Sequence, residues 1–398
     1  MRLLTLLVIS IALAGCQSLG ASFSNAISGT VDLVTGGGEV ADPPRELKSI
    51  DPEIEIEVLW DEDIGAGDDG HWLALTLANA GDKLFAADQD GLITAIRFED
   101  GETIWEVETE QPISSGPSLG LESVIVGTSE AEVIAVRQED GETLWTAKVS
   151  SEVLAPPEVS QGIVVVHSND GALFALDEAN GKVLWSYEQR ASPLSLRGSG
   201  APTIESDVVV VGFAKGKLAV LRLSDGKILW ERQVALTRGV SEVDRLVDID
   251  SKPVIDDNII FVTAYHGGVV AVSLVDGEVI WRNDRIVASS NPAISWRYFF
   301  VTDENSDVWS LDKNTGRPYW KQTDLHRRKL TSPVIYKDYL VVGDYKGYLH
   351  FLSREDGHQM GRIRISRSPI RTAPVVHEDY LISYASDGDL AVLTVTNE

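Results

Sequence analysis

A turn motif recurs along most of the chain: a short polar step ending in Gly, with Trp four residues later. DGETIW at 100–105 returns as DGETLW at 140–145, and related copies follow. The motif glycines are Gly101, Gly141, Gly181, Gly226, Gly277, Gly316 and Gly357, spaced 39 to 51 residues apart. The last copy has Gly361 where Trp is expected. A period near 40 residues, in segments rich in β-branched residues, is typical of a β-propeller.

An alternating apolar strand recurs with the same period as the turn motif. Each turn motif follows an alternating apolar strand such as DGLITAI at 90–96, and eight such strands occur, the last being DGDLAVL at 387–393. Trp60, in EIEVLW, adds a Trp strand before the first repeat. We therefore predict an all-β fold, an eight-bladed propeller of four-stranded antiparallel blades, in which the N-terminal strand joins the last blade and leaves no free edge. A seven-bladed ring is the alternative if the copy near Gly361 is not a blade.

The repeated Trp residues are predicted to dock one blade on the next. A buried indole removes a large apolar area from water, so repetition of this residue favours a stacked array over independent domains. The predicted blade-docking residues are Trp60, Trp105, Trp145, Trp185, Trp230, Trp281 and Trp320.

The N-terminus has the features of a lipoprotein leader. Arg2 precedes an apolar run, Leu3 to Leu13, that is too short to span a membrane, and Leu13-Ala-Gly-Cys16 resembles a bacterial lipobox. We expect a signal peptide at 1–15, a lipidated Cys16 with a flexible tether at 16–52, and the propeller at 53–398. Gln17 resembles the residue that follows Cys in lipoproteins sorted to the outer membrane. An ordinary signal peptide with an incidental Cys is the alternative.

The charge of the chain restricts its partners. A net charge of −27 argues against nucleic acid and against broad adhesion to anionic lipid, so membrane contact is expected through the lipid anchor only. The basic stretch from Arg362 to Arg371 is interpreted as a solvated outer strand, or else as a secondary docking patch.

Candidate chemistry is sparse. The segment from Ala175 to Trp185 resembles the repeat of pyrroloquinoline quinone enzyme propellers, which serves blade docking. The single Cys cannot form the vicinal pair that often clamps that cofactor, and the seven His show no paired metal spacing. We expect no catalytic residues, metal or cofactor. A quinoprotein-like enzyme or a ligand-binding propeller that uses the central channel stays the alternative.

Two consecutive connections depart from the repeat. The gap from Trp to the Pro that opens the next blade is enlarged after Trp185 and again after Trp230. The first connection contains apolar and cationic residues and the second alternating carboxylates, a composition that indicates a protein-contact site. The candidate partner-binding residues are Leu194, Leu196, Arg197, Asp248 and Asp250. Alternatively, the leucines cover the blade below and Arg197 pairs with an Asp.

Four segments carry a family resemblance: PLSLRG, EVDRLVDID, HRRKLTSPV and VVGDYKGYLHFL. On these the chain resembles the BamB family, the propeller lipoproteins of the machinery that assembles β-barrels in the outer membrane. The resemblance implies a non-enzymatic accessory subunit on the periplasmic side of the outer membrane. It also implies docking of the five candidate residues on the POTRA repeats of BamA, together with other barrel-assembly subunits. Unfolded outer-membrane proteins are a further possible partner.

Overall fold

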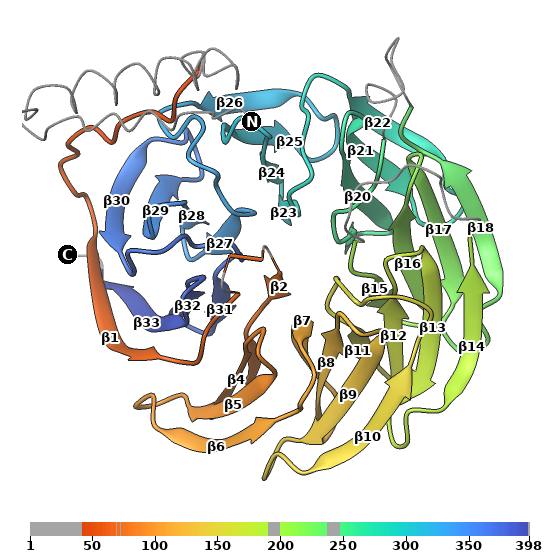
Figure 1. Ribbon diagram of the computed structural model, residues 1–398. Coiled ribbons are helices and arrows are strands. Elements are labelled where there is room, and N and C mark those ends of the chain that lie inside the picture. The colour runs from red at the N-terminus through yellow and green to blue at the C-terminus, as the bar shows by residue number, and fades with distance from the viewer. Residues whose placement is uncertain (1–41, 69, 72, 190–199, 237–246, 397–398) are drawn as a thin grey trace, which may run out of the picture. The chain divides into compact units, whose positions relative to one another are not determined.

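Eight antiparallel sheets follow one another in a ring in the computed structural model of the chain (Figure 1). The structure describes residues 42–68, 70–71, 73–189, 200–236 and 247–396. Residues 45–398 belong to one compact unit. Secondary structure in the described residues consists of strands, and no helix there is long and apolar enough to cross a membrane.

Each sheet is one blade, with strands A to D from the inside of the ring to its rim, and in blades 1 to 7 these strands follow one another along the chain. Blade 1 has β3 (Ala78–Ala80), β4 (Lys83–Ala87), β5 (Leu92–Arg97) and β6 (Thr103–Glu108); blade 2 has β7 (Ile113–Leu119), β8 (Ser123–Thr128), β9 (Glu132–Arg137) and β10 (Thr143–Lys148). Blade 3 has β11 (Glu158–Ser160), β12 (Ile163–His167), β13 (Ala172–Asp177) and β14 (Val183–Glu188); blade 4 has β15 (Thr203–Glu205), β16 (Val208–Phe213), β17 (Lys217–Arg222) and β18 (Ile228–Gln233).

The second half of the ring repeats this plan. Blade 5 has β19 (Val254–Asp256), β20 (Ile259–Ala264), β21 (Gly268–Ser273) and β22 (Val279–Asn283); blade 6 has β23 (Ala293–Ile294), β24 (Tyr298–Thr302), β25 (Val308–Asp312) and β26 (Pro318–Gln322). Blade 7 has β27 (Val334–Tyr336), β28 (Tyr339–Gly343), β29 (Tyr348–Ser353) and β30 (Gln359–Arg364); blade 8 has β31 (Val375–His377), β32 (Tyr380–Tyr384), β33 (Asp389–Thr396) and β1 (Glu55–Asp63). The short β2 (Ala74–Leu75) adds a parallel strand to β7.

The N-terminal strand closes the ring, as the sequence predicts. β1 pairs antiparallel with β33 over its whole length, from Glu55 opposite Thr396 to Asp63 opposite Asp389. Figure 1 shows the red β1 along the rim beside the blue β33. This pairing supplies the D strand of blade 8, so the eight-bladed prediction is confirmed and the seven-bladed alternative is wrong.

The core lies between adjacent blades. Strands B and C of each blade carry apolar side chains on both faces, and these pack against the neighbouring sheets. In the interface of blades 5 and 6, for example, Phe261, Trp281 and Phe299 are all at most 9% exposed and their rings lie 5.9 to 6.1 Å apart between centroids. No single sheet could cover both of its apolar faces alone, which is why the blades form a continuous array.

The repeated Trp residues dock each blade on the turn of the following one. Every indole N–H donates to a backbone carbonyl of the next blade over 2.7 to 3.2 Å; the acceptors are Phe98, Gln138, Glu178, Leu223, Leu274, Lys313 and Arg354. The turn Gly of that next blade lies against the same ring. A Cβ on Gly181 would stand 2.5 Å from Trp145 Cε3, and Gly181 has a φ of +70°. The turn therefore requires Gly for its conformation and for the space that the indole occupies.

The absence of Trp at position 361 has a physical reason. Gly361 lies in the D strand of blade 7, so a Trp there would dock on the C–D turn of blade 8. Blade 8 has no such turn, because its outer strands β33 and β1 come from opposite ends of the chain. Ile54 and Ile56 cover Gly361 instead, and a Cβ on Gly361 would lie 2.8 Å from Ile54 Cγ1.

The antiparallel order gives the ring two distinct faces. Connections between blades and the B–C turns lie on one face, which we call the connection face. The A–B and C–D turns lie on the other, which we call the turn face.

The segment before β1 already contacts the ring. Arg45 N donates to the His326 carbonyl over 3.0 Å, and Arg328 Nη1 donates to the Arg45 carbonyl over 3.0 Å. Glu53 N then donates to the Met360 carbonyl over 2.8 Å. Arg45 thus already contacts the blades, before the predicted start of the propeller at residue 53.

Candidate partner-binding site

The two connections singled out in the sequence are residues 189–202, between β14 and β15, and residues 234–253, between β18 and β19. Together with residues 64–77, which link β1 to β3 and contain β2, they are the longest links between blades that the described strands define. The described ends of both lie on the connection face, on blades that are neighbours in the ring. Leu194, Leu196 and Arg197 lie outside the described residues, whereas Asp248 and Asp250 lie inside them.

The described ends of the two connections meet. Gly200, at the end of the first, lies so close to the second that a Cβ there would stand 2.8 Å from the Ser251 carbonyl oxygen. The Gly200 carbonyl is also 2.9 Å from His167 Nδ1 in blade 3, and the Thr203 hydroxyl donates to the Pro253 carbonyl. One platform is therefore formed by the bases of both connections. Sequence reasoning missed His167, because a lone His on an apolar strand carries no distinctive signal.

Asp248 is held inside this platform. Its side chain is 3% exposed, and its Oδ1 accepts a hydrogen bond from Lys215 N over 3.1 Å, while its backbone forms a β-bridge with Ala214. In blade 7 the equivalent B–C turn is held by its own Asp344, which accepts from Lys346 N over 2.8 Å. Blade 4 has Phe213 at the position of Asp344, and Asp248 supplies the carboxylate from the following connection.

Ile249 anchors the same segment. It is fully buried in the apolar cluster of blades 4 and 5, against the backbone of Gly212, where a Cβ would lie 2.3 Å from Ile249 Cγ2. The base of the second connection is thus fixed by one apolar and one polar contact on consecutive residues. A rigid base limits the entropy lost when a loop binds a partner.

Asp250 has an unusual charge state. Burial raises its pKa from 3.8 to about 7, and the neighbouring charge of Asp248 adds to the shift. Two carboxylates close together disfavour ionisation of both, so a cationic partner group near Asp250 would favour its charged form.

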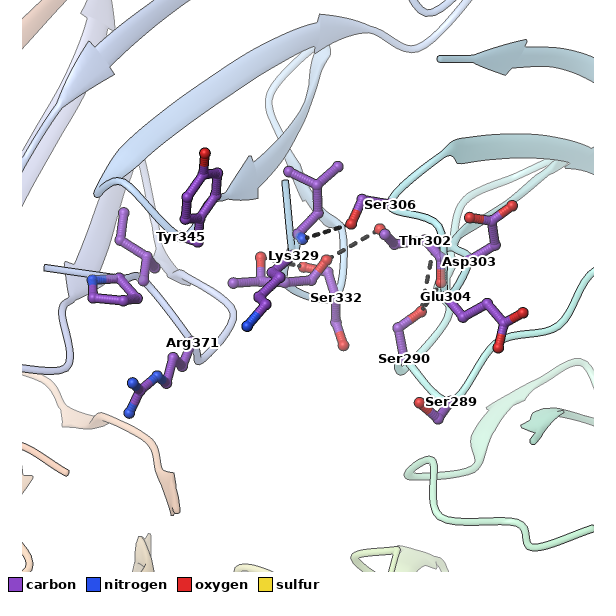
Figure 2. A pocket seen from close by; sticks show the side chains of 14 residues that line it. Ser289, Ser290, Thr302, Asp303, Glu304, Ser306, Lys329, Ser332, Tyr345 and Arg371 are labelled. Carbon is purple, nitrogen blue, oxygen red and sulfur yellow. Dashed lines mark hydrogen bonds between the residues drawn. The ribbon is translucent and has the colours of Figure 1, made fainter. Parts of the chain in front are cut away.

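Apart from the platform, a hollow lies on the connection face between blades 6, 7 and 8 (Figure 2). Its volume is about 410 Å³, and its hydroxyl groups are engaged with the backbone: Ser290 Oγ donates to Thr302 O over 2.7 Å and Ser306 Oγ accepts from Leu330 N over 3.3 Å. Arg371 reaches the hollow but pairs with Asp68. Within the part of the chain that the structure describes, no group of three His, Cys, Asp or Glu is placed to hold a metal ion.

The basic stretch from Arg362 to Arg371 begins in β30 and continues into the link between blades 7 and 8. Arg362 and Arg364 lie at alternate positions of β30, opposite His350 and Tyr348. Arg364 is exposed, donates to the carbonyls of Lys346 and Ser366, and lies 5.4 Å from the centroid of the Tyr348 ring.

These features define the class: an eight-bladed propeller of the quinoprotein repeat type with a platform formed by two enlarged connections. The family model described as outer membrane protein assembly factor BamB matches residues 60–322. A relative in Kangiella koreensis, named outer membrane protein assembly factor BamB, is 40% identical over 98% of this chain and 96% of its own length. The chain belongs to the BamB family.

Solved structures agree on the fold. BamB from Moraxella catarrhalis superposes with a TM-score of 0.78 at 24% identity, over 85% of this chain and all of the other. Quinohemoprotein alcohol dehydrogenase from Comamonas testosteroni has a TM-score of 0.70 at 11% identity, over 85% of this chain and 76% of the other. At such identities the likeness concerns the fold alone.

Proposed function

We propose that the chain is a non-enzymatic scaffold of the complex that assembles β-barrels in the outer membrane. It is anchored there by lipid on Cys16 and faces the periplasm. Membership of the BamB family and the lipobox at Leu13 to Cys16 support this proposal. The alternative, a quinoprotein-like enzyme or ligand-binding propeller, has only the fold likeness to the dehydrogenase in its favour.

The observation that carries the proposal is the platform on the connection face. Two enlarged connections on neighbouring blades share one base, and Asp248 and Ile249 hold that base in place. A pre-organised base with apolar, cationic and acidic residues in its loops fits protein recognition.

The partner we propose is the array of POTRA repeats of BamA. Leu194 and Leu196 supply apolar area. Arg197 supplies a planar guanidinium, a group that is enriched among the residues that dominate interface energetics. Asp248 is buried, so its part in binding is to position the second connection, whereas Asp250 offers a carboxylate at the edge of the platform. Other barrel-assembly subunits and unfolded outer-membrane proteins are proposed as further partners.

A titration of the purified POTRA repeats tests this proposal. The triple variant Leu194→Ala, Leu196→Ala, Arg197→Ala should bind about thirty-fold more weakly, which corresponds to ~2 kcal/mol. Its melting temperature should be unchanged, because the substituted residues belong to a connection and not to a blade core. Asp248→Ala should also weaken binding, and it should speed amide exchange at Lys215.

The matched control is Arg364→Ala, an exposed cation on the D strand of blade 7. It should leave the affinity within about two-fold. Undiminished affinity of the folded triple variant would place docking elsewhere on the ring and contradict the proposal.

A further inference from the structure

Two A–B turns on the turn face depart from the rest: blade 2 has Leu121 at its apex and blade 6 has Trp296. The eight turns between strands A and B have the apex pairs Gly81-Asp82, Leu121-Glu122, Gln161-Gly162, Ser206-Asp207, Asp257-Asn258, Trp296-Arg297, Lys337-Asp338 and Glu378-Asp379. Six of these pairs consist of polar residues and Gly, as tight turns favour. Blade 6 has a Trp instead, although the repeat shows that folding of the turn does not need one.

The Trp296 side chain is exposed to solvent and does not pack in the core. The turn is held by Ser295 and Tyr298, whose backbones exchange hydrogen bonds of 2.9 and 3.1 Å, and the Trp296 side chain is 84% exposed. Arg297 is ordered beside it by three rings: its Cζ lies 4.8 Å from the centroid of Tyr298, 5.9 Å from Tyr319 and 6.0 Å from Trp296. An exposed Trp on a rigid turn is a characteristic anchor of protein interfaces.

A hollow of about 690 Å³ adjoins this turn. It lies between the A–B turns of blades 6 and 7 and the C–D turn of blade 7, and residues 53–54 close its side. Trp296, Tyr298, Tyr339 and Met360 provide apolar walls. A volume of this size accommodates a short segment of polypeptide with its side chains.

The charge of the residues that line the hollow indicates the charge of the molecule that would bind there. Its lining contains the carboxylates of Glu53, Asp338 and Glu355 and a single guanidinium, that of Arg354, which pairs with Asp338 at 2.6 Å. Arg297, beside Trp296, lies in the field of Glu355. Three carboxylates against the two guanidinium groups of Arg354 and Arg297 leave the hollow net negative, as is the whole chain at −27. A second copy of this chain would be repelled, whereas a basic segment would be attracted by both the local and the overall field.

We infer that the hollow beside Trp296 is a docking site for an extended basic segment of a partner protein, in which Arg or Lys alternates with apolar side chains. The apolar side chains pack on Trp296 and Met360, and the cation meets Glu355. This site lies on the turn face, opposite the platform of the proposed POTRA contact. It is independent of that proposal and leaves both faces of the ring available for partners at the same time.

Binding of a defined peptide tests the inference. The probe is a fluorescein-labelled peptide of Arg-Leu-Ser repeats, and the matched probe has Glu in place of Arg. The full-length protein should bind the Arg probe at least about ten-fold more tightly than the Glu probe, and Trp296→Ala should remove that preference by weakening the Arg probe about ten-fold. Glu355→Gln should weaken it by a smaller factor, and added salt should weaken it as well.

Leu121→Ala is the matched control, because Leu121 occupies the equivalent apex in blade 2 and is 87% exposed. This variant should bind the Arg probe as the unaltered protein does, and all three variants should melt at the same temperature. Equal binding of the Arg probe by the Trp296→Ala variant, or no binding of it by the unaltered protein, would overturn the inference. So would Trp296-dependent binding of an N-acetylglucosamine oligomer in place of the peptide, which would indicate a carbohydrate site.

Discussion

At the residue scale, one pair of residues sets the architecture: the Trp of a blade and the turn Gly of the next. The indole N–H reaches a backbone carbonyl, and its ring occupies the space that a Cβ on the Gly would need. Each pair therefore joins two repeats, and a substitution at either member affects both blades. Interdependence of this kind makes the array cooperative although every repeat is short.

Asp250 gives a prediction for pH dependence at the same scale. Its pKa is about 7 in the folded protein against an ordinary 3.8, so the folded state binds more protons between these values. The free energy of unfolding contributed by this group is fully present below about pH 4 and is lost as pH rises to about 7. Asp250→Asn should abolish that loss and raise the melting temperature at pH 8 by a few degrees.

Thermal melts from pH 4 to pH 8 provide the measurement. The exposed Asp61→Asn is the control and should follow the unaltered protein at every pH. Identical pH profiles for Asp250→Asn and the unaltered protein would show that Asp250 ionises normally.

At the element scale, β1 decides whether the ring is closed. It completes blade 8 through its pairing with β33, and Trp60 then docks that blade on Gly101 of blade 1. Blade 7 has adapted to the same closure, with Gly361 in place of Trp and Ile54 and Ile56 against it. One strand thus joins blades 7, 8 and 1.

Deletion of residues 52–60 should open the ring. It removes the partner of β33 along most of that strand, which leaves unpaired backbone groups at an edge, and it removes the Trp60 contact. We expect a fall in melting temperature of more than about 10 °C, since several kcal/mol of apolar burial and hydrogen bonding are lost, and rapid proteolysis within 381–393. Deletion of residues 17–40 is the control and should leave the melting temperature unchanged. An unchanged melt after the 52–60 deletion would contradict closure by β1.

At the scale of the whole molecule, the ring offers two faces with different recognition chemistry. The connection face presents the platform of Asp248 and Asp250, and the turn face presents Trp296 and its acidic hollow. The chain joins the ring at Arg45, where His326 and the buried Arg328 hold its backbone. Any force on the N-terminus is therefore transmitted first to blades 6 and 7.

Cys16→Ser tests the proposed anchor at this scale. The variant should lose acyl labelling and leave the membrane fraction, because Cys16 is the only thiol in the chain and occupies the end of the lipobox. Its melting temperature should stay the same, since Cys16 belongs to no blade of the ring. Continued incorporation of labelled palmitate would contradict lipidation at Cys16.

The sequence by itself determined the fold class, the number of blades and the strand that closes the ring. These follow from local signals: a turn Gly, an alternating apolar strand and a Trp in constant phase, each of which depends on residues close together in the chain. The two long connections were visible for the same reason, as departures from a regular spacing. Membership of the family could also be anticipated from four short segments, two of which lie in those connections.

Only the tertiary structure decided what depends on residues far apart in the chain. Asp248 was predicted as a partner contact, yet it is buried because the B–C turn of blade 4 lacks its own Asp and borrows one from a segment 33 residues away. Gly361 stands in place of Trp because the outer strand of blade 8 is β1, which comes from the other end of the chain and leaves no C–D turn for a Trp to contact. The hollow beside Trp296 combines residues 53–54 with blades 6 and 7, a proximity that ring closure creates and no local pattern encodes.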